Sequence, residues 1–157
     1  MNLDHLYPYG FRSTLFDRLI PEQHHMKGLS IQQLRESVAR DLEDLLNSRV
    51  AKIDELMQDY PLAGKSILQF GIMDFVGLST ANPLDRDKIC QSIEQSIAAH
   101  EPRLRQVKVE MLLDGHNLGS LCLSIQAYFN IQPLYEPVVF DALLKPTTQQ
   151  YVISARS

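Results

Sequence analysis

One acidic residue, Glu101, has neighbours that could support acid–base chemistry. It directly follows His100 and stands two positions before Arg103. Cleavage of a glycosidic bond uses two carboxyl groups that face each other across the scissile bond at about 5–10 Å. Glu43 and Glu136 are candidates for the second group, but their sequence positions do not place either one opposite Glu101. An ion pair of Glu101 with Arg103, or with a partner's charge, explains the residue more simply.

A second candidate for a functional site is the fragment Gly64-Lys65-Ser66, which matches the last residues of a phosphate-binding P-loop. The full motif needs a glycine five positions before Gly64, where this chain has Asp59. A carboxylate at that position would repel phosphate, and no clear strand leads into the loop. The fragment is therefore interpreted as an ordinary loop.

Metal-binding and nucleophilic residues also lack the spacing that their chemistry requires. The histidines are His5, His24, His25, His100 and His116. None has a His, Cys or carboxylate at ligand spacing on a plausible helix, and the two cysteines, Cys90 and Cys122, do not have zinc-site spacing. No serine stands in a Gly-x-Ser-x-Gly turn. The sequence predicts no catalytic residue, no metal site and no cofactor.

Composition sets the class of protein. The chain has 157 residues, of which 45% are apolar and 22% charged, as expected of one globular domain. We assign residues 1–12 to a flexible arm and residues 13–157 to a single domain. The net charge of −4 disfavours nucleic acid as a partner, and no run approaches the roughly 20 apolar residues of a membrane span. The absence of a signal-peptide pattern and the low cysteine content indicate the cytoplasm.

The first half of the chain has the periodicity of helices. Ser30 is a candidate N-cap with Gln33 as its capping-box partner, and apolar residues then recur at steps of three and four over residues 31–48. A second helix is expected to begin after a cap at Asn82 or Asp85 and to stop at Pro102, which lacks a backbone donor. The apolar stripe of this second helix is Ile89, Ile93 and Ile97.

Beyond Pro102 the period changes to two, as in strands. Residues 107–113 and 121–131 alternate around turn material at residues 114–117, which predicts a long antiparallel hairpin. Residues 138–140 and 151–153 are expected to form shorter strands. The predicted fold class is α+β: a small antiparallel or mixed sheet with a long hairpin, and two main helices packed on one face.

Five segments, in this order along the chain, resemble a known family. They are Ser13-Thr14-Leu15-Phe16-Asp17-Arg18-Leu19, residues 36–49, residues 66–75, Glu101-Pro102-Arg103-Leu104 and Glu136-Pro137-Val138-Val139-Phe140-Asp141. The family is that of TssE, a baseplate subunit of type VI secretion systems, related to a contractile-phage baseplate wedge protein long labelled "lysozyme-like". The resemblance covers roughly residues 13–141, and the tail from Ala142 to Ser157 is not matched.

The resemblance implies a structural subunit and not an enzyme. Family members sit in the baseplate wedge near the hub and inner tube, and the first sheath ring adds strands to their sheet, so wedge, sheath and hub subunits are the expected partners. Glu101, Pro102 and Arg103 are expected to bind a partner, because they stand at a helix–strand corner from which side chains can project. Two alternatives stay open: a peptidoglycan hydrolase that uses Glu101, and a generic adaptor domain.

Overall fold

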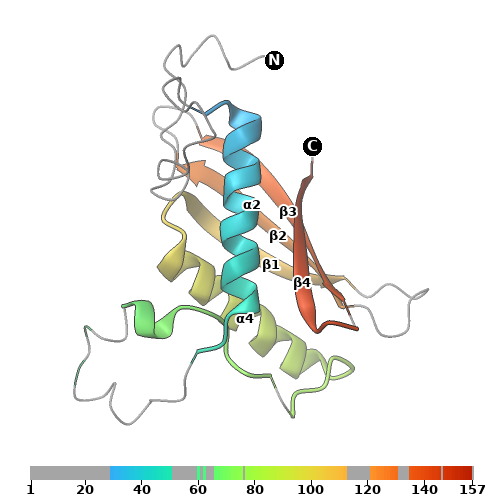
Figure 1. Cartoon of the computed structure of the whole chain (residues 1–157). Coiled ribbons are helices and arrows are strands. Elements are labelled where there is room, and N and C mark those ends of the chain that lie inside the picture. Colours follow the sequence, from blue (N-terminus) through green and yellow to red (C-terminus); the bar gives the residue numbers. More distant parts are fainter. Residues whose placement is uncertain are drawn as a thin grey trace.

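Two helices lie on one face of a four-stranded antiparallel sheet in the computed structural model (Figure 1). The structure describes residues 29–50, 60, 62, 66–75, 77–112, 121–130, 135–145 and 147–156. The main elements are α2 (Ile31–Asn47), α4 (Pro83–His100), β1 (Leu104–Leu112), β2 (Leu121–Asn130), β3 (Tyr135–Lys145) and β4 (Gln150–Arg156). The predicted α+β class is confirmed. The expected arm at 1–12, the segment 13–19, Gly64-Lys65 and the turn 114–117 lie outside the described residues.

Helix α2 begins where the capping box was predicted. The hydroxyl of Ser30 accepts from the Gln33 N–H at 3.2 Å, and the Gln33 side chain accepts from the Ser30 N–H at 2.9 Å. Two backbone donors that the first turn would leave unpaired are thereby bonded. The helix buries one stripe of side chains against the sheet: Leu34, Ser37, Val38, Ala39, Leu42, Leu45 and Leu46.

Helix α4 takes Asn82 as its N-cap, whose side chain accepts from the Leu84 N–H at 3.1 Å. Asp85, the alternative cap, instead accepts from the Ser79 N–H at 3.2 Å and so ties the preceding turn to the helix. The predicted stripe of Ile89, Ile93 and Ile97 is buried. The helix ends at His100, just before the corner that contains Pro102.

The strands follow one another in the order β1-β2-β3-β4, each antiparallel to the next. The pairing of β1 with β2 confirms the predicted hairpin strands. β3 and β4 are longer than predicted, since they span 11 and 7 residues. Pro137 and Asp141 interrupt the apolar run in β3, which is why the alternation is clear only at its centre. The unmatched tail therefore supplies the end of β3 and the whole of β4.

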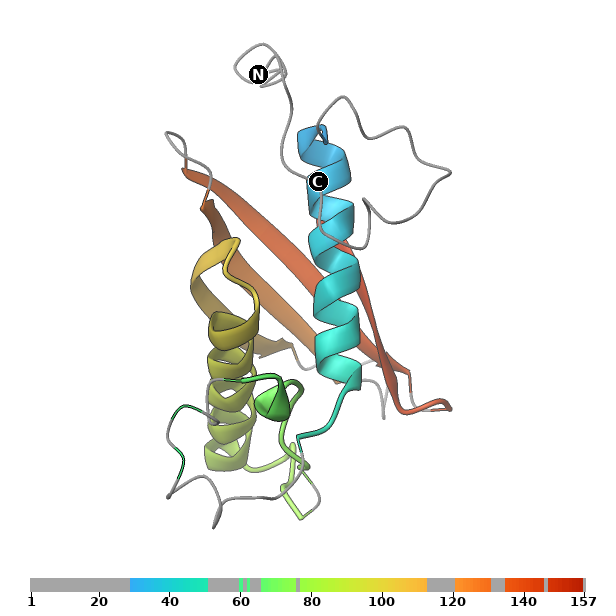
Figure 2. The same cartoon turned by 60° about the vertical axis from the view of Figure 1, so that its left-hand side comes forward.

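The core lies between the sheet and the two helices, which Figure 2 shows side by side on that face. Phe129 and Phe140 from the sheet and Leu42 and Ile93 from the helices are fully buried. α2 packs mainly on β4 and α4 mainly on β1. No helix among the described residues is long and apolar enough to cross a membrane.

Gly71 lets the connection between the helices pass close to α2. Its φ is +123°, and a Cβ there would lie 2.8 Å from the backbone carbon of Ser48. Only glycine fits both the conformation and the space. The approach allows Ile72 to form a parallel bridge with Arg49, and it places the Gly71 carbonyl 2.5 Å from the Ser96 hydroxyl that donates to it.

Candidate docking site

The corner between α4 and β1 is formed by the three residues that the sequence singled out. Glu101 caps the helix by donating its N–H to the Ile97 carbonyl at 2.8 Å, and its own carbonyl accepts from the Leu104 N–H at 3.1 Å. Pro102 is exposed and Arg103 half-buried. The chain turns here because Pro102 cannot continue the helical hydrogen bonds.

Arg103 is held by two carboxylates from different elements. Its Nε donates to Glu101 Oε1 at 2.7 Å, and its Nη2 donates to Glu101 Oε2 at 2.5 Å and also to Asp41 of α2. Burial alone would lower the pKa of Arg103, but the hydrogen bonds and charges of Glu101 and then Asp41 raise it above its ordinary value. The charged guanidinium therefore ties the corner to the middle of α2.

The burial of Glu101 differs from the sequence expectation. Glu101 is only 5% exposed, so its side chain does not project from the corner. It forms the ion pair with Arg103 that was predicted as its non-catalytic use. A buried carboxylate requires such a partner, because desolvating an unpaired charge is costly. The surface of the motif that a partner can reach consists of Pro102 and the outer part of Arg103.

The carboxylates considered for glycosidic cleavage have separate structural contacts. Glu43 accepts from the backbone N–H of Ile153 at 2.9 Å, and Glu136 pairs with Arg35 at 2.5 Å. Glu43 and Glu136 thus connect helix α2 with strands β4 and β3.

Metal-binding groups are also absent from the described part of the chain, where no three His, Cys, Asp or Glu side chains cluster. His100 instead bonds the Gln69 carbonyl through Nε2 at 2.9 Å and packs edge-on against Phe70. The other four histidines lie outside the described residues. Neither Cys90 nor Cys122 forms a disulfide in the described part of the chain.

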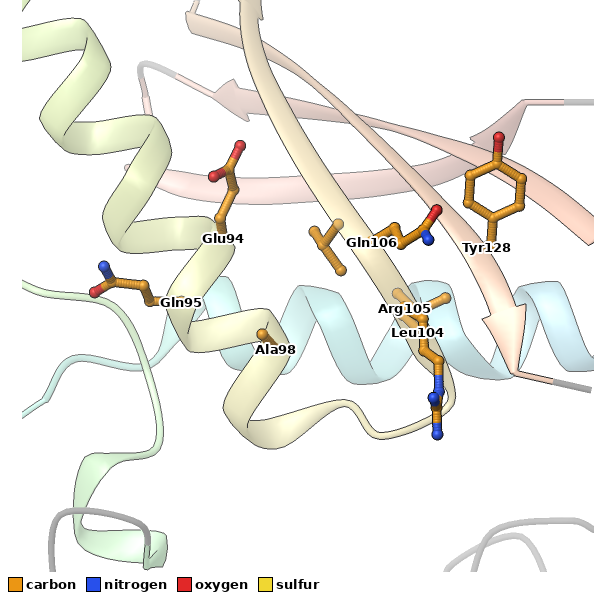
Figure 3. A pocket seen from close by; sticks show the side chains of 8 residues that line it. Glu94, Gln95, Ala98, Leu104, Arg105, Gln106 and Tyr128 are labelled. Atoms are coloured by element: carbon orange, nitrogen blue, oxygen red, sulfur yellow. The ribbon is translucent and has the colours of Figure 1, made fainter. Parts of the chain in front are cut away.

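A groove adjoins the corner, between α4 and the start of β1 (Figure 3). Its volume is about 940 Å³. Figure 3 shows Glu94, Gln95 and Ala98 on the helix side, opposite the first residues of β1. Tyr128 of β2 also lines the groove, and it is 41% exposed. The groove therefore continues the reachable surface of the corner along the helix.

The groove combines an apolar floor with one available positive charge. Leu104 and Val107 supply apolar surface. The carboxylate of Glu94 is occupied, because it accepts from the Val109 N–H at 2.8 Å. Arg105 is exposed and, within the described residues, forms no ion pair. Such a surface can hold an apolar anchor and a carboxylate of another chain.

A bulge shapes this end of β1. The register shifts between Arg105 and Lys108, and Gln106 has a φ of +52°. A bulged edge pairs poorly with a further strand, so a partner would engage the side chains of the groove and not its backbone.

The sequence did not predict Arg105, Tyr128 or the groove as part of the site. The only trace in the sequence is the spacing of three between the apolar residues Leu104 and Val107, where a regular strand has two.

Comparison with known proteins shows a family and a similar solved structure. Residues 32–134 match the family model described as "Baseplate wedge protein gp25". A solved chain from a structure described as "The baseplate complex from the type VI secretion system" superposes with a TM-score of 0.50 at 13% identity, over 73% of this chain and 96% of that one. At this identity the second match shows a shared fold. No curated protein matches the chain.

Proposed function

The chain belongs to the family of the baseplate wedge protein gp25, and from this premise we propose that it is a structural subunit of a type VI secretion baseplate, of the TssE kind, that acts in the cytoplasm. The family is a structural component of baseplates, which supports a structural role for this chain. In the proposal the subunit docks on other wedge subunits, lies near the hub and inner tube, and starts the sheath.

The observation that carries the proposal is the extent of the family match. Residues 32–134 include nearly all of α2, the corner at Glu101-Pro102-Arg103 and every residue that lines the groove. The matched region is therefore the region that holds the candidate docking surface, and not only the core. The fold shared with a chain of a type VI secretion baseplate complex supports the same assignment.

The corner and the groove are proposed as the contact with a wedge subunit. Pro102 is the exposed edge of the corner. The Arg103 side chain is 26% exposed and its partner Asp41 is 44% exposed, so a second chain can reach both. In this arrangement Glu101, Asp41 and Ser37 hold the planar guanidinium of Arg103 in one orientation, and its exposed part can face a second chain.

Arg105 gives the proposed contact a preference for a partner with a negative charge. It is a positively charged residue that lines the groove, and within the described residues it forms no ion pair. A partner segment with an apolar side chain for Leu104 and Val107, and a carboxylate for Arg105, would complement the surface. Because an interfacial charge pair is partly desolvated, reversing one of its charges weakens binding more than it affects folding.

Sheath initiation is the second part of the proposal. The sheet is open, and an open edge presents unpaired backbone N–H and C=O groups to which an extended partner segment can add. The proposed partner at the sheet is the first ring of sheath subunits. Strand β1 lines the groove and β4 forms the opposite edge of the sheet, so a segment that adds to β4 would not compete with a partner in the groove.

The test is co-purification of the tagged full-length chain with the wedge subunits and, separately, the sheath subunits of the same machine. Arg105→Glu should reduce recovery of wedge subunits at least about tenfold, as expected for reversal of an interfacial charge. Lys88→Glu is the matched control, because Lys88 is an exposed lysine on α4 that does not line the groove. Failure of the unchanged chain to recover any wedge subunit would refute the proposal, and equal recovery with Arg105→Glu would remove the groove from it.

A further inference from the structure

Gln106 has a backbone conformation that a side chain makes costly. Its φ is +52°, in the left-handed region that glycine adopts freely and other residues rarely adopt. The residue lies in the bulge of β1, between the pairs that Arg105 and Lys108 form with β2. Bulges with a left-handed residue usually have glycine at that position. The chain has Gln instead, and it therefore carries a strain that glycine would relieve.

The strain at Gln106 is not explained by the packing of the subunit itself. Gln149, the other described non-glycine residue with a positive φ, closes the turn between β3 and β4 by donating its N–H to the Lys145 carbonyl at 2.9 Å. Gln106 instead lies inside β1, and its side chain is exposed and forms no hydrogen bond within the described residues. Strained residues of this kind collect where a side chain contacts a ligand or a partner.

The bulge brings two consecutive side chains to the groove. In a regular strand, neighbours along the chain point to opposite faces of the sheet, so only Arg105 or Gln106 would be expected there. Both residues are exposed and both line the groove. In Figure 3 the Gln106 side chain lies between α4 and Tyr128 of β2. The groove therefore contains an amide in addition to the positive charge of Arg105.

An amide differs from a charge in what it can bind. The Gln106 side chain has an acceptor oxygen and a donor NH2 group, so it can bond both the N–H and the C=O of a peptide group. Peptide groups inside a helix or a sheet are already hydrogen-bonded, whereas those of an extended segment outside a sheet are available. An amide at this position thus favours a partner segment whose backbone is unpaired.

We propose that Gln106 is a specificity-determining residue of the groove, and that its amide bonds the backbone of an extended, acidic segment of a wedge subunit. This inference rests on the proposed function, from which it takes the wedge subunit in the groove. An apolar side chain of the segment lies on Leu104 and Val107, its carboxylate pairs with Arg105, and a neighbouring peptide group is held by Gln106. Because the bulge fixes the backbone that carries this side chain, less conformational freedom is lost when the partner binds.

The test compares affinity and stability of the full-length chain, with purified wedge subunits of the same machine as the probe. Gln106→Gly should weaken binding by about tenfold, the expected effect of losing one or two hydrogen bonds. Its melting temperature should equal or exceed that of the unchanged chain, because the strain is relieved. A lower melting temperature would show that Gln106 is not strained, and would overturn the inference.

Gln106→Ala separates the amide from the backbone. It removes the amide but keeps a Cβ and with it the restricted backbone, so binding should weaken by the same factor as in Gln106→Gly. A loss of affinity in Gln106→Gly without a loss in Gln106→Ala would show that the backbone and not the amide matters, which contradicts the proposal.

Gln149→Gly is the matched control, because it makes the same change at a residue with a φ of +56°. Gln149 follows the end of β3, whereas the groove lies at the start of β1, which is aligned through β2 with the start of β3. This variant should leave the affinity for wedge subunits unchanged, and a loss equal to that of Gln106→Gly would refute a specific role of Gln106.

The same measurements separate this inference from the proposed function. If Arg105→Glu weakens binding while Gln106→Gly and Gln106→Ala bind as the unchanged chain does, the role of Gln106 is refuted and the groove contact stands. If the unchanged chain binds no wedge subunit, the proposed function itself fails, and the role of Gln106 fails with it.

Discussion

Arg103 folds back onto Glu101, two residues before it in the chain, with 2.7 Å between its Nε and the Glu101 Oε1. Glu101 is almost fully buried, whereas the Arg103 side chain keeps 26% of its surface exposed. Glu101 is thus the buried, structural residue of the pair, and Arg103 is the residue that a partner can reach. Stability and the proposed docking at this corner are therefore linked, so variants must be measured for both.

Removing the Arg103 side chain should destabilise the free subunit. In Arg103→Ala the buried carboxylate of Glu101 loses its cation, and we expect the free energy of unfolding to fall by about 1–3 kcal/mol, the usual effect of an unsatisfied buried group. Urea denaturation of the purified chain measures this. The double variant Glu101→Gln/Arg103→Gln should recover part of the loss, since no buried charge remains. A midpoint for Arg103→Ala equal to that of the unchanged chain would show that Glu101 does not depend on Arg103.

The buried stripe of α2 should be sensitive to truncation. Leu42 has no exposed surface and lies in the core between α2 and the sheet. Leu42→Ala should lower the free energy of unfolding by about 2–5 kcal/mol, through lost burial and the cavity left behind. Gln32→Ala, an exposed change on the same helix, is the control and should cost less than about 0.5 kcal/mol. A melting temperature for Leu42→Ala equal to that of the control would mean that this face of α2 is not core.

Local patterns predicted most of the fold. The capping box at Ser30 and the isoleucine stripe of α4 are set by neighbours along the chain, so both helices were predicted from sequence. The full lengths of β3 and β4 were not, because Pro137 and Asp141 break the alternation and only pairing across the sheet shows where the strands end. The docking site was found only in part for a similar reason. The position of Arg103, which pairs with Glu101, depends also on Asp41 and Ser37 of another helix, which no local motif indicates.

Alkaline pH should destabilise the fold through the buried Tyr151 and the partly buried Cys90. Burial raises the pKa of the Tyr151 hydroxyl, an effect that the positive charge of Arg49 offsets in part, and burial followed by the charge of Glu94 raises the pKa of the Cys90 thiol. The folded state then holds these protons more tightly than the unfolded state. The resulting stabilisation is present below the unfolded pKa values of about 8.5 and 10 and is lost as the pH rises through the higher folded values.

The melting temperature should therefore fall from about pH 9 upward. Tyr151→Phe removes one of the two groups and should flatten the fall, and Cys90→Ala should flatten its lower part. Thermal unfolding between neutral pH and about pH 11 measures the effect. An unchanged slope in the Tyr151→Phe, Cys90→Ala double variant would show that other groups cause it.

The purified chain should not cleave peptidoglycan. Glu101 is committed to Arg103, and the other carboxylates considered, Glu43 and Glu136, are bonded to Ile153 and Arg35. A suspension of cell walls should keep its turbidity equally with the unchanged chain and with Glu101→Gln. Clearing by the unchanged chain that disappears in Glu101→Gln would establish a hydrolase and contradict a purely structural role.

The most direct measurement of the central claim is sheath assembly in cells that encode this chain. A fluorescent sheath subunit reports whether contractile sheaths form. We expect sheaths to be absent when the chain is deleted, restored by the unchanged chain and by the control Lys88→Glu, and not restored by Arg105→Glu even though that variant remains folded. Sheaths that form at the normal frequency in the deletion strain would contradict the role of this chain as a baseplate subunit that starts the sheath.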